Sequence, residues 1–138
     1  MVKTTVQASS MSMSVLVVDD DEFSQEVLRK RLVQFGVTDI HSAHDGRAGV
    51  FALDQMDRAP DVIFCDIFMP DMDGIEFVEE LVARNFRGGL VLVTGVNRDM
   101  LTVAQDIATL NGLKVLGAFT KPLDREALGQ ALGLLANS

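Results

Sequence analysis

Short runs of apolar, β-branched residues alternate with helix-like segments along the chain, and this alternation restricts the fold more than any other feature. Three of the runs are apolar throughout, as expected for strands buried on both faces of a parallel sheet. Alternating β and α segments of this length predict an open, doubly wound α/β sheet with right-handed crossovers. The predicted strands are Val15–Val18, Val37–Ala43, Val62–Cys65, Leu90–Val93 and Val115–Phe119.

A helical pattern follows each predicted strand. In the first helix, apolar residues recur at spacings of three to five, which predicts one apolar stripe that packs on the sheet; they are Phe23, Val27, Leu28, Leu32 and Phe35. Residues 1–13 contain no continuous apolar block and predict a flexible polar tail before a single domain at residues 14–138. The predicted helices are Glu22–Phe35, Gly46–Met56, Ile75–Arg84, Asp99–Leu110 and Arg125–Leu135.

The composition restricts where such a domain works and what it binds. A net charge of −8 disfavours direct contact with nucleic acid, because phosphates repel an acidic surface. No apolar run reaches the 18 or more residues that suggest a membrane span, so we expect no membrane insertion. The single cysteine, Cys65, cannot form an internal disulfide. This agrees with a reducing compartment, and we expect a cytoplasmic location.

The first predicted strand runs directly into four acidic residues, in the stretch VLVVDDDE. Like charges about 4 Å apart repel by roughly 4 kcal/mol near a protein surface, so something must offset the repulsion. One interpretation is a solvated strand end at which Asp21 caps the following helix. The other is a divalent-cation site, because Mg²⁺ prefers carboxylate oxygens as ligands.

Polar residues also follow three of the other predicted strands. Asp66 follows the third strand, Thr94 the fourth and Lys121 the fifth, while Asp19 and Asp20 follow the first. In doubly wound sheets, ligands bind outside the carboxyl ends of the strands. Three carboxylates, a hydroxyl and an ammonium group should therefore share one edge of the sheet, and this joint placement favours the cation site.

Four motifs, VLVVDDD, VIFCDIFMPDMDG, VLVTG and KPL, occur in an order and spacing that resemble the receiver domain of bacterial two-component response regulators. The resemblance covers about Ser14 to Leu135. It implies a flavodoxin-like (βα)5 sandwich whose parallel sheet has the strand order 2-1-3-4-5. It also implies a phosphoacceptor signalling domain, not an independent enzyme, which receives a phosphoryl group from a histidine kinase or phosphotransfer protein and then switches an output interaction.

The resemblance implies a role for each residue at the sheet edge. Asp66 matches the phosphoacceptor. Lys121 matches a lysine that pairs with Asp66 and later with the phosphoryl group, and Thr94 matches the hydroxyl that follows the phosphoryl oxygen. Such roles are chemically reasonable, because phosphoryl transfer requires mainly positioning and neutralisation of charge. The implied ligands of Mg²⁺, for which Mn²⁺ can substitute, are Asp19, Asp20, Asp66 and the backbone carbonyl of Phe68.

The chain departs from the resembling family at one position. Many receivers have Tyr or Phe three residues before the lysine, where this chain has Ala118. Phe119 should face the other side of the strand, because side chains alternate. The segment NGLKVLGAFTKPLD is similar to receivers fused to EAL-type cyclic-di-GMP phosphodiesterase domains. A C-terminal EAL-type output domain and a phosphorylation-dependent homodimer are therefore further expectations.

The remaining polar residues have simpler interpretations. We expect Asp21 to cap the first helix, His41 and His44 to be surface or strand residues and not ligands, and Cys65 to be a buried small hydrophobe. Gly74 should occupy a tight loop that has no room for a Cβ.

The residues and motifs argue against two other functions. A receiver used only as an unphosphorylated interaction domain would not need the intact set Asp20, Asp66, Thr94 and Lys121. A small hydrolase or nucleotide-binding enzyme would need a nucleophile elbow or a Gly-rich phosphate loop. Neither G-x-S-x-G nor G-x-x-x-x-G-K-[ST] occurs in the sequence.

Overall fold

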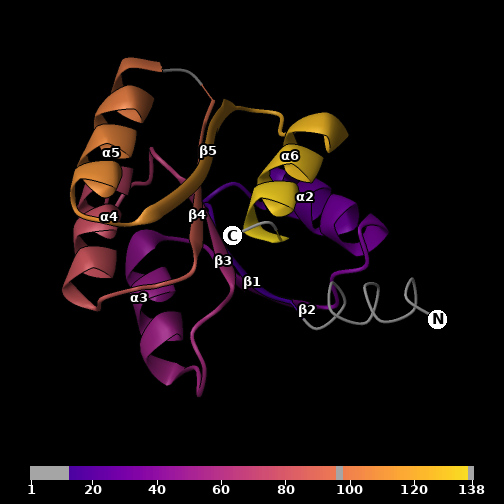
Figure 1. Cartoon of the computed structure of the whole chain (residues 1–138), viewed down its shortest axis with the longest axis horizontal. Coiled ribbons are helices and arrows are strands. Elements are labelled where there is room, and N and C mark those ends of the chain that lie inside the picture. The colour runs from indigo at the N-terminus through magenta and orange to yellow at the C-terminus, as the bar shows by residue number, and fades with distance from the viewer. Residues whose placement is uncertain (1–12, 96–97, 137–138) are drawn as a thin grey trace.

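The computed structural model describes residues 13–95 and 98–136, which form a parallel sheet with helices on both faces (Figure 1). Five strands pair in the order β2-β1-β3-β4-β5, which confirms the predicted flavodoxin-like topology. Strand order reverses at β1, so the ends of β1 and β3 lie side by side at the switch point. The strands are β1 (Ser14–Val18), β2 (Asp39–Ala43), β3 (Val62–Asp66), β4 (Gly89–Thr94) and β5 (Lys114–Thr120).

The helices divide between the two faces of the sheet, with α3, α4 and α5 on one face and α2 and α6 on the other (Figure 1). All predicted elements are present within about two residues of their expected bounds. Among the described residues, no helix is both long enough and apolar enough to cross a membrane. The helices are α2 (Glu22–Gln34), α3 (Gly46–Gln55), α4 (Gly74–Ala83), α5 (Arg98–Leu110) and α6 (Arg125–Ala136).

The predicted N-terminal tail, residues 1–13, lies outside the described residues except for Met13. That residue is partly buried and packs against the core beneath α2 and α6. The flexibility of the tail stays a prediction.

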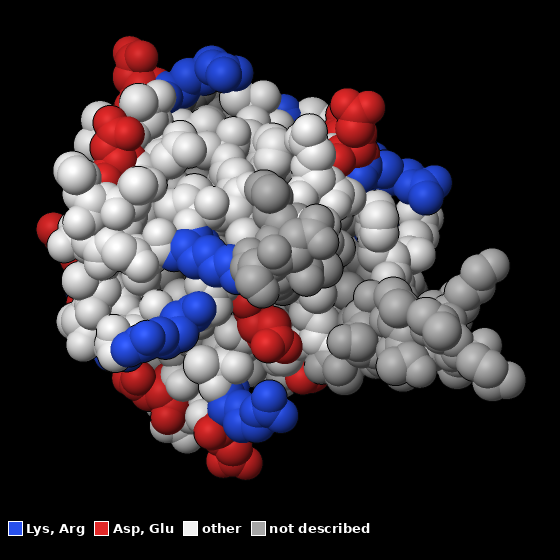
Figure 2. All heavy atoms as spheres, in the orientation of Figure 1, with Lys and Arg blue, Asp and Glu red and all other residues white. Residues whose placement is uncertain are grey.

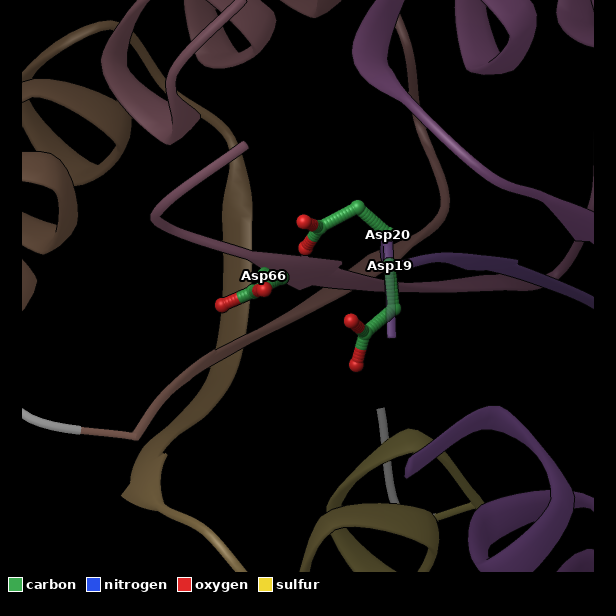
Figure 3. Close-up of side chains that lie close together, drawn as sticks. All are labelled: Asp19, Asp20 and Asp66. Carbon is green, nitrogen blue, oxygen red and sulfur yellow. The ribbon is translucent and has the colours of Figure 1, made fainter. Parts of the chain in front are cut away.

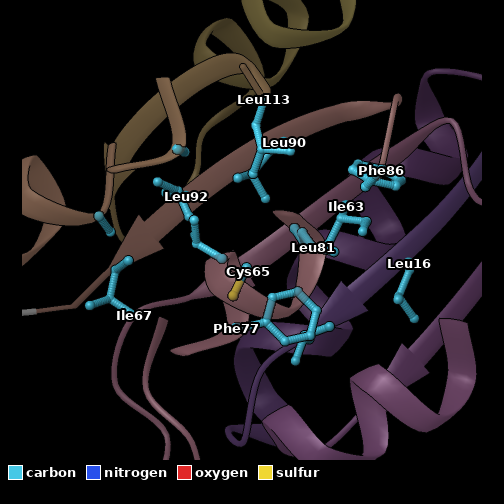
Figure 4. Close-up of a cluster of buried hydrophobic side chains, with 14 of the residues drawn as sticks. Leu16, Ile63, Cys65, Ile67, Phe77, Leu81, Phe86, Leu90, Leu92 and Leu113 are labelled. Atoms are coloured by element: carbon cyan, nitrogen blue, oxygen red, sulfur yellow. The ribbon is translucent and has the colours of Figure 1, made fainter. Parts of the chain in front are cut away.

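Two hydrophobic cores hold the sheet between its helices. The α3–α5 core, shown in Figure 4, includes Leu16, Ile63 and Phe77. The α2–α6 core lies on the opposite face and includes Val17 and Phe64. Neighbouring residues of one strand enter different cores because side chains alternate along a strand. Each fully buried side chain of this kind contributes about 1.5–3 kcal/mol, so these cores fix the strands whose ends carry the polar groups.

The predicted apolar stripe of α2 is wrong in its first turn. The side chain of Phe23 is 76% exposed, whereas Gln25 is buried. The amide of Gln25 donates hydrogen bonds of 2.7 Å to the carbonyls of both Asp19 and Ala43. The first turn of α2 lies beside the ends of β1 and β2, where a polar side chain can bond the backbone carbonyls. The Ala43 carbonyl, which also accepts from Asp19 N at 3.1 Å, gains a second hydrogen bond.

A bulge in β5 sets the orientation of its last residues. Leu90 pairs with Val115 but Val91 pairs with Gly117, so β5 contains one extra residue at this point. Beyond the bulge, Ala118 packs against the α3–α5 core and Phe119 against the α2–α6 core. This confirms the prediction that these two side chains face opposite sides.

A pair of glycine substitutions tests how tightly α3 packs. A Cβ at Gly49 would lie 2.9 Å from side-chain carbons of both Phe77 and Val18, whereas one at Gly129 in α6 would lie 3.6 Å from the ring of Phe35. Overpacking costs about 1–3 kcal/mol, while Gly to Ala in an uncrowded helix gains up to about 1 kcal/mol. We expect Gly49→Ala to lower the free energy of unfolding and Gly129→Ala to raise it, measured by urea denaturation with circular dichroism. Equal gains in both variants would contradict the tight contact at α3.

Candidate functional site

Three carboxylates meet at the carboxyl edge of the sheet. Asp19 and Asp20 directly follow β1, and Asp66 is the last residue of the adjacent strand β3. One oxygen from each carboxylate lies within 4.8 Å of the other two, as Figure 3 illustrates. Asp19 and Asp66 are only 7% and 6% exposed, while Asp20 faces solvent. The structure therefore brings together the three side chains that the sequence predicts.

Lys121 supplies the positive charge that faces this cluster. Its Nζ lies 2.9 Å from Oδ2 of Asp19 and 3.3 Å from Oδ2 of Asp66. The backbone N–H of Lys121 donates to the carbonyl of Thr94 at 2.7 Å, which fixes the segment after β5 to the end of β4. The predicted pair with Asp66 is confirmed. The shorter contact with Asp19 was not predicted, because sequence order shows which strand ends meet but not which side chain a flexible lysine reaches.

Burial and charge set the protonation of these groups. Burial raises the pKa of Asp66 to about 6, and the neighbouring Asp19 carboxylate adds to the rise against the opposing charge of Lys121. Burial also opposes the charge of Lys121, but the carboxylates of Asp19 and Asp66 outweigh this and raise the pKa of the amine. At neutral pH the site therefore holds a charged lysine beside an Asp66 carboxylate that is ionised at a free-energy cost.

The other two predicted site residues lie close to Asp66. Thr94 is fully buried at the end of β4, one residue beyond Val93, which pairs with Asp66 across the sheet. The backbone N–H of Phe68 lies 3.4 Å from Oδ1 of Asp66, and the side chain of Phe68 is 40% exposed. The position of Thr94 is thus set by the end of β4, and that of Phe68 by the backbone directly after β3.

Asp21 caps helix α2, as predicted. Its Oδ2 accepts hydrogen bonds from Ser24 Oγ at 2.6 Å and from Ser24 N at 3.1 Å, and these bonds lower the pKa of Asp21. Its backbone N–H also donates to Oδ1 of Asp19 at 2.9 Å. The cap therefore holds one oxygen of Asp19 in place, and the cation site at Asp19 and Asp20 stays a prediction.

The predictions for the histidines and the cysteine are also confirmed. His41 is exposed and pairs with Asp39 at 2.9 Å, and His44 is exposed as well. Cys65 is fully buried, and burial raises the pKa of its thiol well above the usual range.

An apolar cleft of about 340 Å³ opens beside the carboxylates, between the start of α2 and the segment after β5. Phe23 lies at this cleft with its ring mostly exposed, and Asp66 and Lys121 border the same space. Sequence reasoning missed the cleft because it placed Phe23 in the core. The remaining lining is largely apolar and includes Val17, Val27, Leu28, Phe64, Val93 and Leu123.

Comparison with known proteins decides the family. The sequence matches the response regulator receiver domain over residues 15–133. The chain belongs to this family. Receiver domains are signalling domains of two-component systems, and this receiver carries the family's acidic cluster at Asp19, Asp20 and Asp66.

Individual relatives agree with this assignment. Protein-glutamate methylesterase/protein-glutamine glutaminase from Treponema denticola is 32% identical over 114 residues, which cover 82% of this receiver and 29% of that protein. Chemotaxis protein CheY from Treponema pallidum is 32% identical over 112 residues, covering 81% of this receiver and 74% of CheY. The receiver thus spans less than a third of the first relative.

A solved structure shares the fold. It is a chain of the CheX-CheY-BeF3-Mg²⁺ complex from Borrelia burgdorferi, which matches with a TM-score of 0.76 at 23% identity. The match covers 90% of this receiver and 89% of that chain. At this level of identity the likeness shows the fold alone.

The raised pKa of Asp66 predicts a pH-dependent loss of stability in the receiver. An unperturbed Asp titrates near 3.8, so between about pH 4 and 6 the folded state binds more protons than the unfolded state, and stability falls as pH rises through this window. Without divalent cations, Asp66→Asn should be the more stable protein at pH 7 by up to about 3 kcal/mol. The advantage should shrink as the pH falls from about 6 to 4. Urea denaturation in EDTA, followed by circular dichroism, measures it, and a difference that does not change with pH would contradict the assignment.

Proposed function

We propose that this receiver accepts a phosphoryl group on Asp66 in a Mg²⁺-dependent reaction and thereby switches an output interaction. One observation carries the proposal: three strand-end carboxylates lie within 4.8 Å of one another, and the lysine that follows β5 contacts two of them. A carboxylate that becomes an aspartyl phosphate is an established form of covalent catalysis.

The residues present fit a magnesium ion. Their donors are carboxylate oxygens, the hard ligands that Mg²⁺ prefers, and the exposed Asp20 leaves room for the waters that the ion retains. Asp19, Asp20 and Asp66 would hold the ion together with the backbone carbonyl of Phe68. When bound, Mg²⁺ supplies neutralisation of the phosphoryl oxygens. Mn²⁺, which accepts the same oxygen ligands, should substitute for it.

The chain's own residues carry the transfer. An ionised oxygen of Asp66 attacks phosphorus while the bond from phosphorus to the donor imidazole nitrogen breaks, and the donor keeps that electron pair. With a pKa of about 6, Asp66 is ionised at neutral pH. Lys121 is close enough to follow the charge as it moves to the phosphoryl oxygens, and Thr94 supplies a hydroxyl at the neighbouring strand end.

A histidine kinase or a phosphotransfer protein is the proposed donor. Such a partner must place a phosphohistidine beside Asp66, and the apolar cleft with Phe23 at its rim offers a contact surface next to that position. On the face shown in Figure 2, Lys and Arg side chains are interspersed with Asp and Glu, which does not resemble a nucleic-acid surface. We also propose that this receiver is cytoplasmic, that it acts with an EAL-type output domain and that it forms a homodimer when phosphorylated.

Labelling by a small phosphodonor tests the acceptor. Incubation with acetyl phosphate and Mg²⁺ should add one phosphoryl group to the wild type, as read by intact mass, and EDTA should prevent the addition. Asp66→Asn should remain unlabelled. Asp57→Asn, which changes an exposed carboxylate beside the start of β1, should label like the wild type. Labelling of Asp66→Asn at the wild-type rate would overturn the proposal.

A second experiment separates docking from chemistry. We expect Phe23→Asp to slow phosphotransfer from a phosphorylated histidine kinase by about tenfold or more, because a charge replaces an apolar contact at the interface. Labelling by acetyl phosphate, which needs no docking surface, should change far less. Phe51→Asp is the matched control, since Phe51 is 65% exposed on α3, across the sheet from α2. Equal effects of both substitutions on kinase transfer would remove Phe23 from the docking surface.

A further inference from the structure

The β3–α4 loop, which follows the acceptor Asp66, is hydrogen-bonded to the start of helix α3. Asp71 belongs to the β3–α4 loop, and its two oxygens accept hydrogen bonds from the first two N–H groups of α3. Oδ1 lies 3.1 Å from Gly46 N, and Oδ2 lies 2.9 Å from Arg47 N. A carboxylate in this position also gains from the positive end of the helix dipole.

Helix α3 already has a cap of its own. Asp45 is its N-cap residue, and Oδ1 of Asp45 accepts a hydrogen bond from Ala48 N at 2.7 Å. Asp71 therefore adds a second cap from a segment that lies 24 residues or more away in sequence. Its contribution goes beyond helix stability, because the same two bonds also fix the loop that carries it.

The loop is fastened at a second point, directly after the acceptor. Gly74 N donates to the carbonyl of Ile67 at 2.7 Å, and a Cβ at Gly74 would lie 2.9 Å from Ile67 Cα. This close approach confirms the prediction that Gly74 lies where a Cβ has no room. Near Asp71, a Cβ at Gly46 would lie 2.6 Å from Cβ of Met72, so the loop also lies directly against the start of α3.

Between these two points the chain has three residues, Phe68 to Pro70. They begin at the backbone whose N–H lies 3.4 Å from Oδ1 of Asp66. A movement of the far end has to be absorbed by the backbone dihedrals of these three residues, because the near end is closed by the Ile67–Gly74 bond and the φ of Pro70 is fixed by its ring.

We propose that Asp71 is a positioning residue for the phosphoryl-transfer site: by binding the start of α3, it holds the Phe68 backbone where that backbone can contribute to Mg²⁺ binding beside Asp66. The inference rests on the proposed function. Burial opposes ionisation of Asp71, but the N–H groups of Arg47 and Gly46 outweigh it and lower its pKa, so the carboxylate keeps its charge at neutral pH. The residue acts through the loop and does not itself touch the reacting atoms.

A set of four variants of the full chain separates positioning from simpler roles. Asp71→Ala removes both bonds, and Asp71→Asn keeps one oxygen acceptor. Asp45→Ala removes the local cap of the same helix without touching the loop. Asp73→Asn removes one charge from the same loop, and its amide oxygen can still cap α4 at Glu76 N.

Three measurements are made on each variant. Amide hydrogen exchange at Gly46 and Arg47 reports the two bonds directly, without any metal. Mg²⁺ affinity is measured by titration of ¹⁵N–¹H chemical shifts, and labelling by acetyl phosphate is measured at low and at saturating Mg²⁺.

For Asp71→Ala we expect faster exchange at Gly46 and Arg47 and a Mg²⁺ dissociation constant raised by about tenfold, the usual scale for a residue that orients a metal ligand. Labelling should be slow at low Mg²⁺ and recover at saturating Mg²⁺. Asp71→Asn should fall between Asp71→Ala and the wild type. Asp45→Ala should lower the melting temperature but leave Mg²⁺ affinity within twofold of the wild type.

Several outcomes would overturn the inference. Unchanged Mg²⁺ affinity in Asp71→Ala would do so, and an equal loss of affinity in Asp45→Ala would reduce Asp71 to a helix cap. An equal loss in Asp73→Asn and Asp71→Asn that disappears at high salt would show an effect of charge alone. If the wild type itself binds no Mg²⁺, the proposed function fails and the inference fails with it, whereas the other outcomes leave the proposed function intact.

Discussion

The burial of neighbouring carboxylates at the ends of β1 and β3 is the constraint on which the rest of this structure depends. Parallel pairing brings Asp19 and Asp66 to one edge, and the two cores keep the strands from separating to relieve the charge. Burial raises the pKa of Asp66 to about 6 despite the opposing charge of Lys121, and the neighbouring Asp19 carboxylate adds to the rise. The folded protein thus retains an unfavourable electrostatic free energy that a divalent cation can relieve, and this favours binding at the site over a passive acidic surface.

Hydrogen bonds from outside the cluster hold two of its charged residues, Asp19 and Lys121, in place. Asp21 N fixes one oxygen of Asp19, and the amide of Gln25 fixes the Asp19 carbonyl to the end of β2. On the other side, Lys121 N is bound to the carbonyl of Thr94. These bonds join four different connections of the sheet, so Asp19 and Lys121 cannot move without breaking hydrogen bonds. Electrostatic stabilisation of a transferred phosphoryl group requires such preorganisation.

Much of this arrangement could be predicted from the sequence, since β-branched runs, helical periods and strand-end residues each depend on short-range patterns. The failures share a physical cause, which is that they depend on contacts between distant segments. Phe23 falls at the helical spacing of the apolar stripe, which predicts burial. In the folded protein the first turn of α2 lies beside the end of the sheet, and Phe23 stays exposed there. The contact of Lys121 with Asp19 depends on a flexible side chain, and the bonds of Asp71 to α3 depend on how two loops cross.

The same contacts bear on how phosphorylation could be communicated without an aromatic switch. Ala118 lies opposite Leu92 on the α3–α5 side, and its methyl group has no rotamer that could follow a movement of Thr94. Phe119 cannot replace the missing ring, because it packs in the other core. A change at the site must then leave through backbone, and the β3–α4 loop is one backbone route that the structure joins to a helix by two side-chain bonds. A shift of the loop on phosphorylation would act on the start of α3, which lies on the same face of the sheet as α4 and α5. The change would then reach that face without the rotation of an aromatic side chain in β5.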